Sequence, residues 1–235
     1  MTRHRSLFCL LLLAAVAHTG CERREEAAPQ AQPDVPPAPA PSPAPEASGA
    51  MAPAELLADV REDLADAREN FAENDRDDAA GELRDAAGKV RQYAQGAGAD
   101  VRQDLTNAAS ELDALAGEVR SGAITSTAML DHRLAGVHAA LAKAHIASSR
   151  EAWGRRELAA AGRHVTAAAD ELEIGLTRLG RGIDAGAAAV IRDARDLGGR
   201  LARGAEATPA DVERVFKGLG DEIEKLHRAA APSQR

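Results

Sequence analysis

Three histidines are the side chains of this chain best suited to binding a metal. His138 and His145 are seven residues apart, so they lie on one face of the helix predicted over 126–153. His164 lies on the next predicted helix, and a turn near Arg155 would place it level with His145. Imidazoles on facing helices can bind zinc, copper or heme iron. No CxxC or HExxH motif supplies further ligands. Our leading interpretation is therefore that these three histidines bind no metal. The alternative is that together they form a metal site.

Catalytic motifs are not recognisable elsewhere in the chain. The pair Ser148-Ser149 has no preceding strand, and no G-x-S-x-G motif is present. Asp75, Asp77 and Asp78 resemble the start of a calcium loop, but the EF-hand glycine and terminal glutamate are missing. We expect these aspartates to cap a helix instead. The sequence predicts neither enzymatic activity nor a cofactor.

The elements that must position the histidines are helices. No proline lies between Pro53 and Pro209, alanine is abundant, and aromatic residues make up 2% of the chain. Such a composition favours helix over strand. We therefore predict an all-α body at 51–235, with helices at about 53–73, 76–96, 99–121, 126–153, 156–179, 182–203 and 208–230.

Local signals mark the ends of these helices. Thr208 followed by Pro209 predicts an N-cap with proline in the first turn. Asp100 with Gln103 three residues later predicts a capping box. The glycines expected in the left-handed conformation after a helix are Gly122 and Gly204. Gly81, Gly117 and Gly162 lie inside predicted helices, where each costs about 1 kcal/mol relative to alanine and is tolerable if it marks a close helix crossing.

The chain repeats itself at a spacing of 82 residues without a gap. Identity is modest, but the apolar phase is kept, which indicates a tandem duplication. Within each unit the spacing between successive apolar residues alternates between four and three positions. This is the heptad spacing of helices packed about 20° from parallel. We predict duplicated units at about 53–125 and 126–204 and a final helix at 208–230, forming an about seven-helix antiparallel bundle or a short helical array. The core is expected to contain Leu105, Leu112, Leu134, Leu141, Trp153, Val165, Leu172, Leu197 and Phe216.

Two predicted hairpins, 55–96 and 137–179, resemble those of tetratricopeptide repeats. The spacing of 82 differs from the period of about 34 in that family, whose tryptophan and tyrosine positions hold other residues here. The resemblance implies a scaffold that binds peptides or proteins, and a generic helical hairpin is the alternative. The small and apolar residues that recur are Ala79 and Ala161, Leu83 and Val165, and Ala86 and Ala168.

The N-terminus has the layout of a secretory signal. Basic residues precede an apolar run at 7–17, which is too short to span a membrane because a spanning helix needs about 20 residues. The following Thr19-Gly20-Cys21 resembles the lipobox of bacterial lipoproteins. That resemblance implies removal of 1–20, acylation of Cys21 and, with Glu22 next, sorting to the periplasmic face of the outer membrane. Cleavage after Ala17 is the alternative and would give a soluble periplasmic or secreted protein.

The segment at 21–50 is rich in proline and alanine. Nine of the eleven prolines lie between Pro29 and Pro53, and bulky apolar side chains are almost lacking at 21–50. Such a segment cannot bury enough surface to fold, so we predict an extended tether. A proline-rich ligand for a partner is the alternative interpretation.

The body is acidic. The formal net charge is −8, and residues 51–100 contain 13 acidic and 6 basic side chains. This charge repels phosphates, so we expect no nucleic-acid partner. We expect instead a non-enzymatic, lipid-anchored envelope protein, monomeric or a modest homo-oligomer, whose bundle binds or scaffolds an unknown envelope protein. The alternative is a periplasmic carrier that holds a metal or small ligand at His138, His145 and His164.

Overall fold

The computed structural model describes residues 53–180 and 182–231, and every regular element in these ranges is a helix. This confirms the predicted all-α fold and helical bundle. Cys21, the predicted signal at 1–20 and the predicted tether at 21–50 lie outside the described residues. None of the described helices combines the length and hydropathy needed to cross a membrane. The helices are α1 (Pro53–Ala72), α2 (Arg76–Gly96), α3 (Ala99–Ser121), α4 (Thr127–Gly154), α5 (Leu158–Arg178), α6 (Ala185–Ala202) and α7 (Pro209–Ala230).

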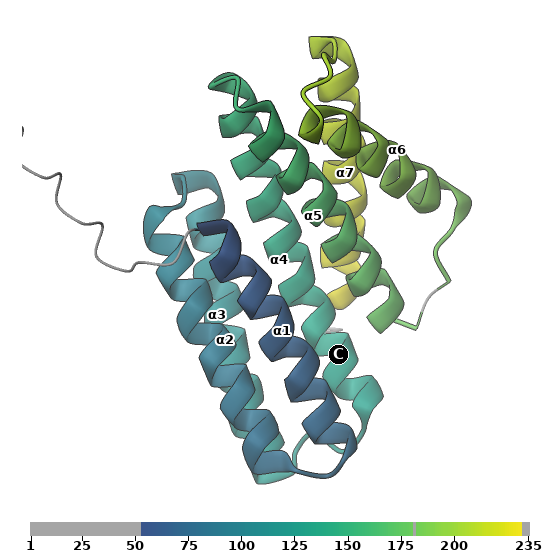
Figure 1. Cartoon of the computed structure of the whole chain (residues 1–235). Coiled ribbons are helices and arrows are strands. Elements are labelled where there is room, and N and C mark those ends of the chain that lie inside the picture. Colours follow the sequence, from purple (N-terminus) through teal and green to yellow (C-terminus); the bar gives the residue numbers. More distant parts are fainter. Residues whose placement is uncertain (1–52, 181, 232–235) are drawn as a thin grey trace, which may run out of the picture. The chain divides into compact units, whose positions relative to one another are not determined.

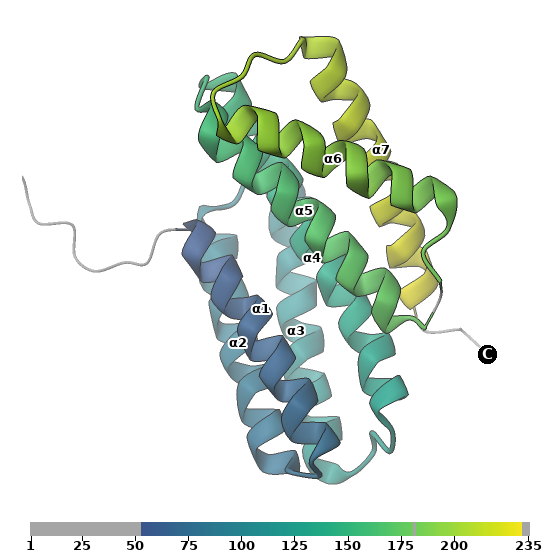
Figure 2. The same cartoon turned by 45° about the vertical axis from the view of Figure 1, so that its right-hand side comes forward.

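Helix α4 belongs to two hydrophobic cores at once. It lies between α1–α3 on one side and α5–α7 on the other (Figures 1 and 2). Its leucines, including Leu134 and Leu141, join the core formed with α1, α2 and α3. Its other apolar face, including Ala135, Ala139 and Ile146, joins the core formed with α5, α6 and α7. The fold therefore consists of two four-helix groups that share α4.

The helix boundaries repeat at the offset seen in the sequence. Helices α2 and α5 begin at 76 and 158 and end at 96 and 178, and helices α4 and α7 begin at 127 and 209. The turns repeat as well, since Asn74 and Arg156 are both left-handed, with φ of 68° and 62°. At this offset the first part of α4 corresponds to α7, and its second part corresponds to α1. Helix α4 is thus the last helix of one group and the first of the next.

Most of the predicted helix ends are confirmed. Thr208 and Asp75 each accept a hydrogen bond from the backbone N–H three positions later, at 3.1 and 3.2 Å. Gly122 and Gly204 adopt φ of 80° and 73° after α3 and α6. The capping box predicted at Asp100 is wrong, because α3 has already begun one residue earlier, after a glycine without a side-chain cap.

The predicted core is confirmed with one exception. Trp153 is only partly buried and packs against the edge of the second core, because it lies next to the last residue of α4. The other eight predicted core residues are buried: Leu105, Leu112, Leu134, Leu141, Val165, Leu172, Leu197 and Phe216.

Two glycines let α6 cross closely over α5, and Figure 2 shows α6 running obliquely across that helix. A Cβ atom added at Gly162 would lie 2.5 Å from the carbonyl oxygen of Gly198 and 2.7 Å from a backbone nitrogen of α6. Gly162 therefore marks a close crossing of two helices. Gly81 and Gly117 do not mark such crossings, since an added Cβ there would meet no atom of another segment within 4 Å.

We expect Gly162→Ala to lower the free energy of unfolding by about 2 kcal/mol, because the rigid backbone of α6 cannot yield to the new methyl group. Gly81→Ala is the matched control. It adds the same methyl group to open space inside a helix and should stabilise the protein by up to about 1 kcal/mol. Urea unfolding followed by circular dichroism measures both changes, and two variants of equal stability would contradict the close crossing.

Candidate functional site

A column of polar side chains runs along the junction of α1, α4 and α5. The residues on α4 and α5 recur every seven positions, which keeps them on one face of each helix. Because α5 runs antiparallel to α4, the last residue of one set faces the first of the other. We call this column the polar ladder. Its members are Arg61 and Arg68 from α1, Asp131, His138 and His145 from α4, and His164, Glu171 and Arg178 from α5.

The middle rung of the polar ladder is centred on Glu171, whose side chain is fully buried. Its carboxylate accepts a hydrogen bond from Arg61 Nε at 2.7 Å and lies 2.6 Å from the Nδ1 atom of His138. Burial alone would raise the pKa of Glu171, but the hydrogen bond with His138 and the charge of Arg61 outweigh it and lower the pKa to about 2. The carboxylate therefore stays charged, and its contribution to stability is lost only as the pH falls from its unfolded pKa, near 4.5, through about 2.

The lowest rung pairs one carboxylate with two arginines. Arg68 donates two hydrogen bonds to Asp131, at 2.8 and 3.2 Å, and Arg178 donates one at 2.9 Å. Arg68 belongs to the first four-helix group and Arg178 to the second, so Asp131 on the shared helix connects both. Planar guanidinium groups suit such forked contacts with a carboxylate.

The uppermost rung is formed by two histidines. The Nδ1 atoms of His145 and His164 are 3.3 Å apart, and their ring centroids are 5.6 Å apart. Burial lowers the pKa of His145 to about 4, and burial also lowers the pKa of His164. Both imidazoles are therefore neutral at pH 7, and one ring nitrogen can donate to the other.

The structure brings together two of the three candidate metal ligands. His145 and His164 face each other as the sequence predicts, whereas His138 lies one rung away and is held by Glu171. In the ranges 53–180 and 182–231, no group of three or more histidine, cysteine, aspartate or glutamate side chains is placed to hold a metal ion. Metal binding by these histidines stays a prediction.

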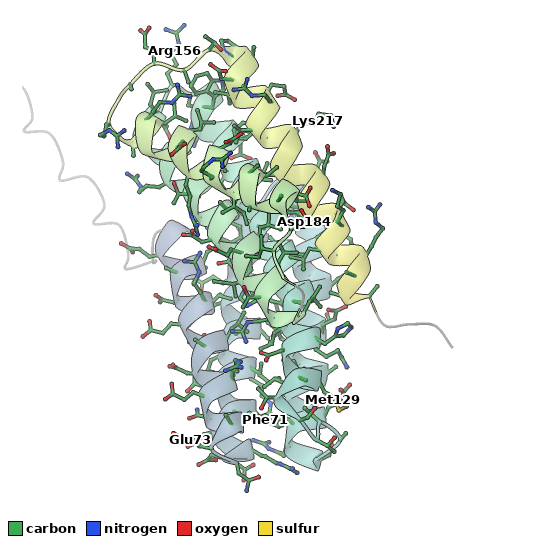
Figure 3. The ribbon with its side chains drawn as sticks, turned by 90° about the vertical axis from the view of Figure 1, so that its right-hand side faces the viewer. Phe71, Glu73, Met129, Arg156, Asp184 and Lys217 are labelled. Atoms are coloured by element: carbon green, nitrogen blue, oxygen red, sulfur yellow. The ribbon has the colours of Figure 1, made fainter. Side chains whose placement is uncertain are left out.

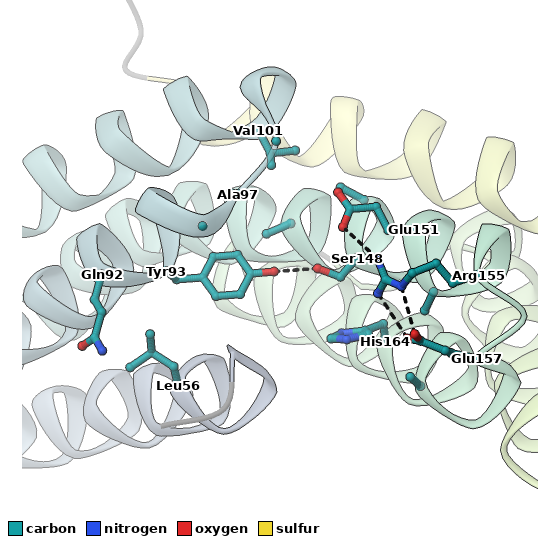
Figure 4. A pocket seen from close by; sticks show the side chains of 16 residues that line it. Leu56, Gln92, Tyr93, Ala97, Val101, Ser148, Glu151, Arg155, Glu157 and His164 are labelled. Carbon is teal, nitrogen blue, oxygen red and sulfur yellow. Dashed lines mark hydrogen bonds and ion pairs between the residues drawn. The ribbon is translucent and has the colours of Figure 1, made fainter. Parts of the chain in front are cut away.

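A cavity of about 360 Å³ lies beside the histidine rung, where α1, α2, α3, α4 and α5 meet (Figure 4). Its walls include Leu56, Val101 and several alanines of α4 and α5. Tyr93 and Ser148 are joined across it by a hydrogen bond of 2.6 Å between their hydroxyl oxygens. His164 forms part of the wall, so the cavity adjoins the polar ladder. Apolar cavities with a few convergent polar groups are typical of small-molecule sites.

Comparisons with known proteins do not identify the site, because no protein family, curated protein or solved structure matches the chain. The function must therefore be argued from the cavity, the polar ladder and the N-terminal sequence.

The polar ladder and the cavity were not predicted from the sequence. The signal for the ladder was present, since polar residues occur at seven-residue intervals at 131, 138 and 145 and again at 164, 171 and 178. These positions coincide with the faces that pack between helices, where an unpaired charge would be costly. Matching the two series in antiparallel order would have predicted the three rungs.

Replacing Glu171 by Gln removes the negative charge between Arg61 and His138 while keeping the shape of the side chain. We expect the free energy of unfolding to fall by about 3–5 kcal/mol, the usual loss when one partner of a buried ion pair is removed. Urea unfolding at pH 7.5 measures this change. The control is Asp221→Asn, which removes the exposed partner of Lys217 at 2.6 Å and should cost at most about 1 kcal/mol. Equal losses in the two variants would contradict the role of the middle rung.

The lowered pKa of His145 predicts an acid-sensitive fold. Because the unfolded chain takes up a proton near pH 6.5 and the folded chain only near pH 4, stability should fall as the pH drops through this window. Between pH 7.5 and pH 5 this amounts to about 2 kcal/mol. His145→Asn should reduce the pH-dependent loss by that amount, whereas His227→Asn, at the corresponding exposed position of α7, should leave it unchanged. The prediction fails if His145→Asn and the unmodified protein lose equal stability between the two pH values.

Proposed function

We propose that this chain is a non-enzymatic, lipid-anchored envelope protein whose helical body is a tethered binding module. The observation that carries the binding role is the cavity at the junction of five helices, which is lined by side chains from both four-helix groups. The support for anchoring is the lipobox-like Thr19-Gly20-Cys21 after a short apolar run.

The proposed mechanism is confinement. A lipid on Cys21 would hold the body near the membrane, and the tether at 21–50 would let it search a limited volume. Confinement of this kind raises the effective concentration of a weak partner or ligand without any new contact. The proposed location is the periplasmic face of the outer membrane, as the resemblance and Glu22 imply.

The surface of the body favours a monomer over a homo-oligomer. Among the residues that the structure describes, Met129 is the one large apolar side chain that is exposed. It lies toward the same end of the body as Glu73, whereas Lys217 lies toward the other end (Figure 3). A single exposed apolar side chain does not form a patch of the size that marks a protein interface.

The anchoring part of the proposal predicts that Cys21→Ser abolishes incorporation of labelled fatty acid and moves the protein out of the membrane fraction. Cys9→Ser is the matched control, since Cys9 would be removed with the signal and should leave both properties unchanged. Intact-mass spectrometry of the mature protein should give a chain that begins at residue 21 and carries acyl groups. A mature chain that begins at residue 18 with a free thiol would overturn the anchor.

Glu22→Asp should move the protein toward the inner-membrane fraction if the sorting rule applies.

A further inference from the structure

The geometry points to a binding site for a small amphipathic amine in the cavity beside Tyr93: an apolar body would lie among the alanines, and an ammonium group would lie at the mouth. This inference deepens the proposed function, because it names the class of ligand that the binding module takes.

The cavity lies where the large and the small side chain of a helix pair have changed places between the two four-helix groups. At the repeat offset, Tyr93 and Ala144 correspond to Gly175 and Leu226. In the second group Leu226 fills the space, since a Cβ atom added at Gly175 would lie 2.5 Å from its Cδ2 atom. In the first group the large side chain is on the other helix, and its hydroxyl bonds to Ser148. Space remains beside Ala144 as a result.

The Tyr93–Ser148 contact holds this space open. The ring of Tyr93, the only tyrosine of the chain, extends across the cavity toward Ser148 (Figure 4). The hydrogen bond of 2.6 Å joins the two hydroxyl groups and fixes the ring as one wall of the cavity. Alanines such as Ala147 and Ala160 form parts of the lining contributed by α4 and α5, so an apolar body can pack against methyl groups and an aromatic face.

The charges at the mouth decide which polar group the ligand carries. Among the side chains that line the cavity, Glu151 and Glu157 are the carboxylates and Arg155 is the one guanidinium. Arg102 lies outside the lining, where carbonyl oxygens of Ala94 and Ala97 accept its hydrogen bonds. The Arg155 Nε atom is 3.0 Å from Glu157, and its Nη1 atom is 3.8 Å from Glu151. Two carboxylates with one guanidinium leave a net charge of −1, which attracts an ammonium group and repels a carboxylate.

Two probes with the same apolar body and opposite charges test the inference: 1-naphthylmethylamine and 1-naphthylacetate. Isothermal titration calorimetry on the full chain carrying Cys21→Ser should show one site for the amine and at least tenfold weaker binding of the acid. Glu157→Gln should reduce this preference several-fold. The inference is overturned if the amine does not bind at millimolar concentration, or if the acid binds as tightly.

Filling the cavity locates the site. Ala147→Leu should abolish binding of the amine, whereas the control Ala128→Leu, on an exposed position of the same helix, should leave it unchanged. Ala160→Leu fills the cavity from α5. It replaces Ala147→Leu in this test if Ala147→Leu lowers the helical circular dichroism signal. Unchanged binding in both filled variants would refute this location. The calorimetry uses the Cys21→Ser variant, so it does not depend on acylation. A failure to bind the amine therefore leaves the acylation of Cys21 untouched, and a failure of acylation leaves the binding result valid.

Discussion

The buried carboxylate of Glu171 must be neutralised within the protein, and this requirement ties the two four-helix groups together. A carboxylate without solvent or a partner would be very costly. Glu171 obtains its partners from two other helices, Arg61 on α1 and His138 on α4. Because α1 belongs to the first group and α5 to the second, the ion pair forms a direct connection between groups that otherwise share α4. The low pKa of Glu171 reflects the same arrangement: the charge is kept because its surroundings are fixed.

The shared helix explains the small residues on one of its own faces. A helix packed on two sides has little room for leucine on both faces, so α4 directs leucines to one core and mainly alanines to the other. Contacts between alanines are individually weak, and the second group compensates by bringing backbones together, most closely where Gly162 meets Gly198. The polar ladder lies where the two groups meet, and its members pair with one another there.

Much of this fold could be predicted from the sequence, because helix signals are local. The cap at Thr208 and the left-handed Gly122 depend on neighbouring residues, and both predictions were correct. The cap at Asp100 failed because a helix can begin at a glycine without a side-chain cap. The double role of α4 was missed because periodicity gives the apolar faces of a helix but not the helices that cover them. The pairing of His138 with Glu171 was missed for a related reason: it joins residues 33 positions apart, and it emerges only when the polar series of two helices are aligned in antiparallel order.

The two versions of the repeated helix differ in how much of their surface is covered. Fifteen residues of α4 are buried, against eight of α7. On α7, the positions that match Asp131 and His145 are the exposed Glu213 and His227. The outer side of α7 therefore carries polar groups at the positions that correspond to those through which α4 contacts α5. Extending this array by design would first require α7 to receive a second apolar stripe and its own set of buried charge partners. The length of such an array is thus controlled by the surface chemistry of its terminal helix, and a few substitutions there would decide between a closed end and a growing filament.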